Sequence, residues 1–483
     1  MEYRNLSKIL NRYSFEEKMN IMQKYSRDIM SVNGFDVTKR QDIPMPWELE
    51  TFSFFAINNS EYNSKSFKGK GINEFIKMIN TIKSYNHKEL KNNKEKNYFL
   101  IKLFSCLALS QFEIQEFYLY KYFRYYFIFN HISLKDRFSS KFGYIYDEFL
   151  EFGFLCNVAF SFDKSNINDI LDYLFRKYNN IVSQLSISRN KYKELINRFS
   201  NNIDDYMYCV RPIHSYPIII EKKLYIPLPH CLLKATSSSL LYRLTENNNK
   251  LREILGKDVL EDYLYKIIND SNVYDEVIKE KDYIFKKQNR KTTDLMIRKD
   301  DDYLFIDSKS LVPKSNIRLM DEESISNEIN IHVKNVIQIY NHLRKRYFKE
   351  YNFFKIKQSM YNNDKLWGLI VVLEDDYIKR DEIYLRVSDE LKTIKDSNEY
   401  IWLINHIKIV SLYEIEKFTF SKKDIIYPLK EQLKSNRPYD FSLNNVDKNK
   451  ILYKDILLFR KKLQNILQNL AIELLNNNII KKK

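Results

Sequence analysis

Apolar residues recur at helical spacing through most of the first 210 residues, with clusters of Asn, Asp and Ser between the periodic stretches. This pattern predicts helices over residues 6–30, 71–84, 97–131, 140–160, 166–181 and 188–207. Aromatic residues are dense between 117 and 127, and helix packing explains them better than a base-stacking surface. We therefore expect a helical N-terminal domain over residues 1–210.

The pattern changes between residues 211 and 249. Residues 216–220 and 223–227 have the composition of two short strands of a hairpin, and residues 232–245 then have helical periodicity. Histidines and cysteines are close together in this part of the sequence, but they lack the paired CxxC or HxxxH spacing of a zinc site. We interpret them as packing residues: Cys209, His214, His230 and Cys231.

Residues 250–420 mix both periodicities. An amphipathic helix is expected over 251–270, with Glu261 at the border of its apolar face, and a second over 324–351. Between them, strands are expected over 277–285, 292–298 and 303–311, and the continuous apolar run 366–373 suits a strand buried between two layers of helices. Residues 421–483 return to helical periodicity, so the fold class expected for the whole chain is α+β.

Charged residues interrupt two of these apolar strands. Alternation along a strand places Asp307 and Lys309 on the same side. A turn centred on residues 300–301 places Asp294 opposite Asp307 in a regular hairpin. The spacing therefore predicts that these three charged groups converge.

Two carboxylates at one point repel each other, and a divalent cation resolves the conflict. Mg²⁺ prefers oxygen ligands, so Asp294, Asp307 and the backbone carbonyl of Ser308 are its expected ligands, with Mn²⁺ able to substitute. Glu261 is an additional candidate ligand, and Lys309 is expected to orient or deprotonate a water and to stabilise developing charge. The alternative is a salt-bridged surface cluster on an ordinary hairpin.

The arrangement resembles the PD-(D/E)xK phosphodiesterase superfamily, the restriction-endonuclease-like fold, over residues 250–420. The resemblance rests on Asp294, the Asp307-Ser308-Lys309 triplet and the helical Glu261. It implies an α-β-β-β-α-β core with a mixed sheet, metal-dependent cleavage of nucleic acid, and roles in restriction, repair or antiviral defence. Two departures stand out.

In the first departure, Thr293 occupies the position of the proline in the family's name, which the family often tolerates. In the second, Gln338 lies on the later helix, where some relatives place a functional glutamine, but the QxxxY spacing is missing. We interpret His332 and His342, on the same helix, as helix-surface residues rather than general bases.

The length, net charge and cysteine content of the chain bear on its number of domains, its partners and its location. A chain of 483 residues predicts two or three domains, and the net charge of +16 favours a polyanionic partner, although lysines interspersed with 63 acids also serve solubility. Four irregularly spaced cysteines indicate no disulfide framework, and we see no signal peptide and no long apolar run, so a cytoplasmic protein without membrane contact is expected.

Taken together, the sequence predicts a helical domain (1–210), a hairpin with a connecting helix (211–249), a nuclease domain (250–420) and a C-terminal helical segment (421–483). The expected function is a metal-dependent endonuclease, acting on DNA in preference to RNA, as an antiphage defence effector. An RNA-directed nuclease and a non-catalytic nucleic-acid-binding scaffold remain as alternatives. No GxxxxGK[ST] motif occurs, so a sensor or ATPase would be a separate subunit, and no heptad pattern supports a homodimer.

Overall fold

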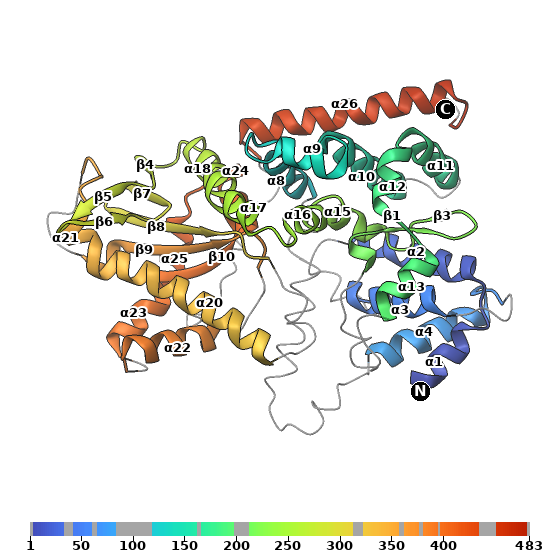
Figure 1. Ribbon diagram of the computed structural model, residues 1–483, viewed down its shortest axis with the longest axis horizontal. Helices are drawn as coiled ribbons and strands as arrows, with labels where there is room; N and C mark the ends of the chain where they lie inside the picture. Colours follow the sequence, from blue (N-terminus) through green and yellow to red (C-terminus); the bar gives the residue numbers. More distant parts are fainter. Residues whose placement is uncertain are drawn as a thin grey trace. The chain divides into compact units, whose positions relative to one another are not determined.

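The computed structural model describes residues 3–32, 42–59, 65–83, 118–161, 166–197, 212–312, 322–356, 362–375, 380–394, 397–433 and 451–480. These residues form two compact units (Figure 1). The N-terminal unit contains the described residues up to 247 and those from 461 onward, and the central unit contains those from 248 to 460. The expected C-terminal segment 421–483 thus divides between the two units at 460.

The helix expected over residues 6–30 is interrupted at residues 11–14, and the periodicity did not predict the helix Pro46–Asn58. The N-terminal unit nevertheless consists mainly of helices. They are α1 (Tyr3–Leu10), α2 (Phe15–Met30), α3 (Pro46–Asn58), α4 (Lys70–Lys83), α8 (Tyr118–Asn130), α9 (Lys135–Phe142), α10 (Tyr146–Ser161), α11 (Ile167–Lys177), α12 (Asn179–Leu185), α13 (Arg189–Asn197), α15 (Leu232–Ala235) and α16 (Ser238–Thr245), with short 3₁₀ helices η2 (Pro212–His214) and η3 (Pro229–Cys231). Of the helix expected over 97–131, residues 97–117 lie outside the described residues, as do residues 198–207 of the helix expected from 188.

A small sheet interrupts these helices. The expected hairpin is confirmed as β2 (Ile218–Ile220) and β3 (Leu224–Tyr225), which pair antiparallel. A third strand, β1 (Ser186–Ser188), pairs parallel to β2. The periodicity did not predict β1, because three residues are too few to show alternation and their partner lies far along the chain.

The central unit alternates helices and strands. Its elements are α17 (Asn249–Ile254), the π-helical segment η4 (Leu255–Leu260), α18 (Glu261–Asn269), β4 (Glu276–Lys279), β5 (Asp282–Phe285), β6 (Gln288–Lys291), β7 (Leu295–Lys299), β8 (Asp302–Lys309), α20 (Glu322–Asn341), the π-helical segment η5 (His342–Arg346), α21 (Tyr347–Glu350), the 3₁₀ helix η6 (Asn363–Lys365), β9 (Leu366–Val372), α22 (Arg380–Leu391), α23 (Asn398–His406), β10 (Ile407–Ser411), α24 (Leu412–Phe420) and α25 (Ile426–Leu433). The last helix, α26 (Lys454–Asn476), begins in this unit and continues into residues assigned to the other.

Five strands form one mixed sheet in the order β10-β9-β8-β7-β4. β4, β7 and β8 pair antiparallel, whereas β8, β9 and β10 pair parallel. The strand expected over 277–285 is wrong as a single element, because it divides after Lys279 and its second half, β5, pairs with β6 instead. Lys286 and Lys287 form the turn between β5 and β6, with φ angles of 50° and 64°.

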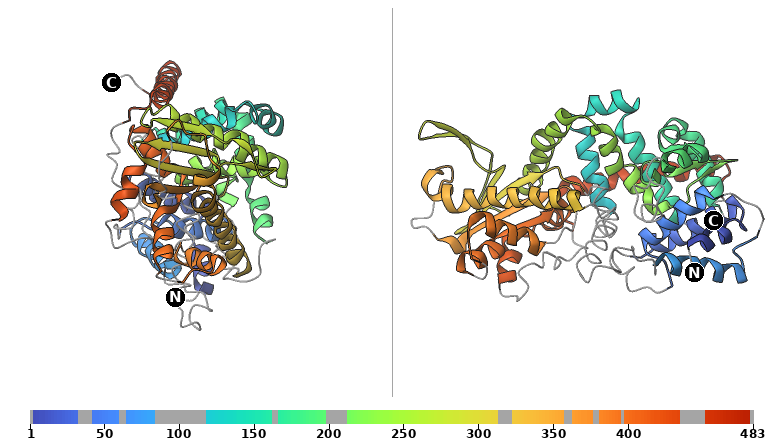
Figure 2. Two further views of the ribbon diagram at one scale, coloured as in Figure 1. Left: turned by 90° about the vertical axis from the view of Figure 1, so that its left-hand side faces the viewer. Right: turned by 60° about the horizontal axis from the view of Figure 1, so that its bottom comes forward.

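Helices cover both faces of this sheet. The long helix α20 lies along one face, and α18 with α24 lies along the other (Figure 1, Figure 2). α20 approaches β9 very closely at Gly368, where an added Cβ would lie 2.3 Å from Cγ2 of Ile339. The glycine in the otherwise bulky run of β9 is therefore the point where the helix rests on the sheet.

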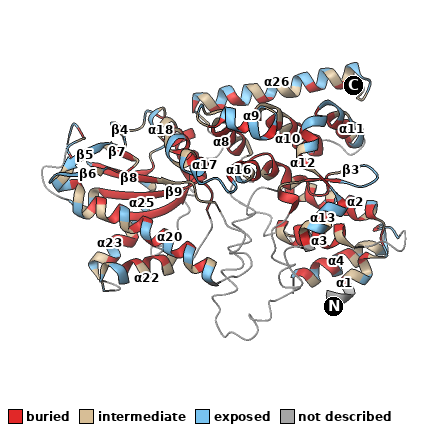
Figure 3. Cartoon of the chain, viewed as in Figure 1, coloured by how far each residue is buried: buried red, intermediate tan, exposed pale blue. Residues whose placement is uncertain are grey.

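The expected apolar faces are the buried ones (Figure 3). The helix expected over 324–351 has a buried apolar side, which consists of Ile325, Ile329, Val333, Val336, Tyr340, Leu343 and Tyr347. Every residue of β9 is buried as well, which confirms the interpretation of the run 366–373 as an interior strand. Among the described helices, none has the length and apolar character needed to cross a membrane.

Candidate active site

The antiparallel pair β7–β8 brings Asp294 and Asp307 together. Leu295 pairs with Ile306, so Asp294 and Asp307 occupy the next opposed positions, as the turn at 300–301 predicts. The Asp294 backbone N–H donates to Asp307 Oδ1 at 3.3 Å. The backbone N–H and the hydroxyl of Ser308 donate to Asp294 Oδ2 at 2.7 and 3.0 Å. The two aspartates are therefore held by the end of the β-ladder rather than by flexible loops.

Asp307 is fully buried, and its carboxylate is only partly satisfied. Its Oδ2 has no hydrogen-bond partner among the described residues, and the nearest cation is the Lys309 ammonium at 3.8 Å. Lys309 is one-quarter exposed, so its ammonium stands between the buried carboxylate and solvent. A buried charge with an unused oxygen is costly unless another cation satisfies it.

Asp307 and Lys309 face the layer of α20. Phe305 lies on the same side of β8, two residues before Asp307, and its ring packs 5.2 Å from that of Tyr347 in α21. Burial is the main cause that raises the pKa of Tyr351 and lowers that of His342; the Asp307 carboxylate adds to the first shift, and the Lys309 ammonium adds to the second. The convergence that the strand alternation predicts is confirmed for Asp294, Asp307 and Lys309.

Glu261 approaches from the other face, at the first position of α18. The preceding π-helical segment η4 carries the chain past the end of β8, where a Cβ on Gly256 would lie 3.7 Å from Oγ of Ser310. The carboxylates of Glu261, Asp294 and Asp307 do not all lie within 4.8 Å of one another. Glu261 therefore borders the site electrostatically and lies outside the tight pair of aspartates.

The pKa of each of the three carboxyls is raised. Burial is the main cause in each, and it raises the pKa of Asp307 to about 7 and that of Glu261 to about 8. Repulsion from Asp294 adds to both shifts, whereas Lys309 opposes them. Acids that resist ionisation beside one another need a positive charge to become carboxylates together at neutral pH.

A fourth acid, Glu280, contributes to the same field. It follows β4 directly, and its negative charge raises the pKa of Glu261, Asp294 and Asp307. Lys291 Nζ donates to Glu280 Oε2 at 2.6 Å. No sequence pattern points to Glu280, because it stands in a run of alternating charges that is typical of a solvated turn.

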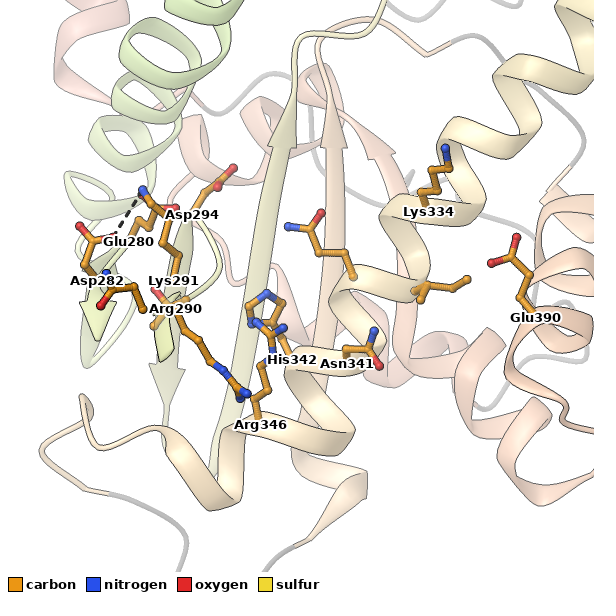
Figure 4. A pocket seen from close by; sticks show the side chains of 14 residues that line it. Glu280, Asp282, Arg290, Lys291, Asp294, Lys334, Asn341, His342, Arg346 and Glu390 are labelled. Carbon is orange, nitrogen blue, oxygen red and sulfur yellow. Dashed lines mark hydrogen bonds and ion pairs between the residues drawn. The ribbon is translucent and has the colours of Figure 1, made fainter. Parts of the chain in front are cut away.

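A cavity of about 720 Å³ opens beside Asp294. In Figure 4, Glu280, Arg290 and Lys291 line it from the β5–β6 side, and α20 with η5 forms the other wall. The helical wall presents a polar row four residues apart: Lys334, Gln338, His342 and Arg346. The i, i+4 spacing of this row is visible in the sequence, and it is the signal by which these residues could have been found.

The interpretation of His332 and His342 as helix-surface residues is wrong. They are 1% and 3% exposed, although His342 also borders the cavity. His342 Nδ1 is hydrogen-bonded to the Tyr351 hydroxyl, and burial lowers the pKa of His342 to about 4. His342 is therefore a neutral imidazole beside the cavity.

The residues at this point suit a hard divalent cation. The unsatisfied Oδ2 of Asp307 and the carboxylate of Asp294 are oxygen ligands of the kind that Mg²⁺ takes while retaining several waters. Thr293, at the position before Asp294, is buried and donates its hydroxyl to the carbonyl of Leu295 at 2.9 Å, which fixes the backbone there. The arrangement can hold one cation at the rim of the sheet with an ammonium group beside it.

Comparison of the chain with protein-family models, with curated proteins and with solved structures finds no match, so the site's chemistry rests on its own geometry.

Proposed function

We propose that the central unit is a metal-dependent phosphodiesterase that cleaves nucleic acid, with DNA as the favoured substrate. The observation that carries the proposal is the buried Asp307 at the end of the paired strands: its Oδ1 accepts from the Asp294 N–H, and its Oδ2, 3.8 Å from Lys309 Nζ, has no hydrogen-bond partner among the described residues. A salt-bridged surface cluster fits poorly, since Asp307 is fully buried. An ordinary surface salt bridge forms between solvent-exposed charged groups and does not require a buried carboxylate.

Each residue has a role in this proposal. Asp294 and Asp307 would hold the cation, and Ser308 fixes the orientation of the Asp294 carboxylate through two hydrogen bonds. Bound Mg²⁺ would supply a Lewis acid and lower the pKa of a coordinated water. Lys309 orients the attacking water and stabilises the negative charge that develops on the phosphate oxygens. Glu261 tunes the charge of the site from α18.

The cavity wall supports a polyanionic substrate. Lys334 and Arg346 line the cavity, and neither forms an ion pair with another residue of the described chain. Such cations match phosphate oxygens, as does the net charge of +16. Gln338 and Asn341 lie beside them and can hydrogen-bond to a sugar or base edge.

The order of elements is a second support. When the separate β5–β6 hairpin is left out, the order α18, β4, β7, β8, α20, β9, with three antiparallel strands followed by a parallel one, agrees with the α-β-β-β-α-β order that the resemblance implies. Two π-helical segments, η4 and η5, also flank the site, directly before Glu261 and beginning at His342. π-Helical turns are rare and concentrate at functional sites.

The test is cleavage by the purified full-length chain. Supercoiled plasmid, linear duplex, single-stranded DNA and RNA are incubated with Mg²⁺, with Mn²⁺ and with EDTA. We expect cleavage with either metal and none with EDTA. Cleavage of RNA alone would favour the RNA-directed nuclease, and binding without cleavage in either metal would favour the non-catalytic scaffold.

Magnesium should stabilise the chain more strongly as pH rises. The raised pKa values of Asp307, about 7, and Glu261, about 8, mean that the folded state holds protons that the unfolded state releases. Stability contributed by these groups therefore falls between about pH 4 and pH 8 without metal. Bound Mg²⁺ offsets that loss only where the acids are ionised.

Thermal unfolding with and without Mg²⁺ measures this effect. At a concentration about 100-fold above Kd, binding contributes about 2.7 kcal/mol, which for a domain of this size is a rise in Tm of roughly 5 °C or more. We expect that rise at pH 8.5 and less than about 2 °C at pH 5.5, where protons compete for the carboxylates. An equal rise at both pH values would contradict the assignment.

A further inference from the structure

A second group of metal-ligand side chains lies in the N-terminal unit, apart from the proposed nuclease centre. Glu50 of α3, His230 of η3 and Cys231 of η3 each offer one ligand atom, and these atoms all lie within 4.8 Å of one another. The side chains of Glu50 and His230 are 4% and 3% exposed, and Cys231 is 2% exposed. Three chemically different ligands thus meet in the interior.

The surroundings orient these ligands. His230 Nδ1 lies 2.7 Å from Ser26 Oγ, which turns the ring so that Nε2 points toward Glu50, 3.7 Å from its Oε1. On the other side, His214 Nε2 lies 3.0 Å from Glu50 Oε2. In metal sites, the ligands are commonly oriented by such neighbours: one contacts the second nitrogen of a histidine, and another contacts the second oxygen of a carboxylate.

We propose that Glu50, His230 and Cys231 bind a zinc ion. A thiolate with an imidazole and a carboxylate is a donor set that suits Zn²⁺ and disfavours Mg²⁺, which takes oxygen ligands. On binding, the Cys231 thiol loses its proton to solvent and the resulting thiolate joins the ion, so the charge balances without any redox step. Glu50 and the two neighbouring ligands are far apart in sequence, so the ion ties α3 to the segment around η3.

Local spacing in the sequence could not predict this group of ligands. His230 and Cys231 are adjacent, and Cys209, which the sequence places near them, lies outside the described residues. The ligand that completes the group is Glu50, which precedes His230 by 180 residues and belongs to a different helix. No local spacing rule can contain it.

Zinc content of the full-length protein tests the proposal. The Asp307→Asn variant serves as the background, so that the proposed nuclease centre does not add to the measured metal. After exhaustive dialysis, mass spectrometry should find about one zinc per chain. Cys231→Ser and Glu50→Gln should each remove most of it, whereas Cys156→Ser, which changes another buried cysteine of the same unit, should retain it.

Cobalt substitution keeps the test decisive if a variant folds poorly. Co²⁺ bound by Cys231 gives a thiolate-to-metal charge-transfer band in the near ultraviolet, which should be present in the parent and in Cys156→Ser and absent in Cys231→Ser. A parent protein that carries no zinc and shows no thiolate band with Co²⁺ would overturn the proposal. So would full zinc retention by Cys231→Ser with native circular dichroism.

Discussion

Asp307→Asn should lower the rate of phosphodiester cleavage by on the order of 10³-fold, equivalent to about 4 kcal/mol of transition-state stabilisation. Asparagine keeps the size of the side chain and can still accept the hydrogen bond that the Asp294 N–H donates to Oδ1. It replaces the buried, unsatisfied Oδ2 with an amide group that cannot serve as an anionic metal ligand. The effect is measured as the initial rate at which supercoiled plasmid is nicked.

The same substitution should not unfold the chain. Burial disfavours the charged form of Asp307, so a neutral side chain at this position is tolerated without metal, and Tm at pH 8.5 in EDTA should stay equal or rise. The Mg²⁺-dependent rise in Tm should disappear. This pairing of lost activity with retained stability separates a metal-ligand role from a structural one.

Asp301→Asn is the matched control, because Asp301 is an exposed acid in the turn of the same hairpin. It should cleave at the parental rate. A rate for Asp307→Asn within about tenfold of the parent would show that the site does not depend on this carboxylate.

Lys309→Met should lower cleavage by about 10²- to 10⁴-fold, the range typical of a group that assists proton transfer or stabilises developing charge. Methionine preserves the apolar stem and removes the ammonium that lies 3.8 Å from Asp307 Oδ2. Single-turnover rates, measured with enzyme in excess over an oligonucleotide duplex, report the chemical step.

Lys309→Met differs from Asp307→Asn in its response to metal. Because both aspartates remain, the Mg²⁺-dependent rise in Tm should persist, although the loss of a neighbouring positive charge raises the pKa of Asp307 further and moves the effect to higher pH. Lys299→Met, at the far end of the neighbouring strand β7, is the matched control and should cleave normally. Parental single-turnover rates in Lys309→Met would remove Lys309 from the proposed chemistry.

The predictions around the site are confirmed where they depend only on residues that are close together in the sequence. Alternation in β8 fixed which side chains share a face, and the polar turn at 300–301 fixed the register, so the meeting of Asp294 with Asp307 could be predicted from spacing alone. The buried face of α20 followed from helical periodicity in the same way.

The sequence-based predictions were wrong where the same pattern of polar and apolar residues is compatible with two different structures. Residues 277–285 alternate as one strand would, yet β5 leaves the sheet and pairs with β6, because the turn at Lys286 and Lys287 gives it a nearer partner. His332 and His342 carry polar rings on a helix with a recognisable apolar face, and the packing of neighbouring elements buries them as well.

The sequence by itself determined the two amphipathic helices at 251–270 and 324–351, the buried strand at 366–373, the strand that carries Asp307 and Lys309, and the opposed position of Asp294. Only the tertiary structure decided that the charge of Glu280 acts on the three site carboxyls, that the polar row of α20 and η5 lines the cavity, and that Glu50 lies beside His230 and Cys231. The physical reason is range: side-chain alternation and helical periodicity are set by neighbours along the chain, whereas burial, pKa shifts and ligand groups depend on residues that only folding brings together.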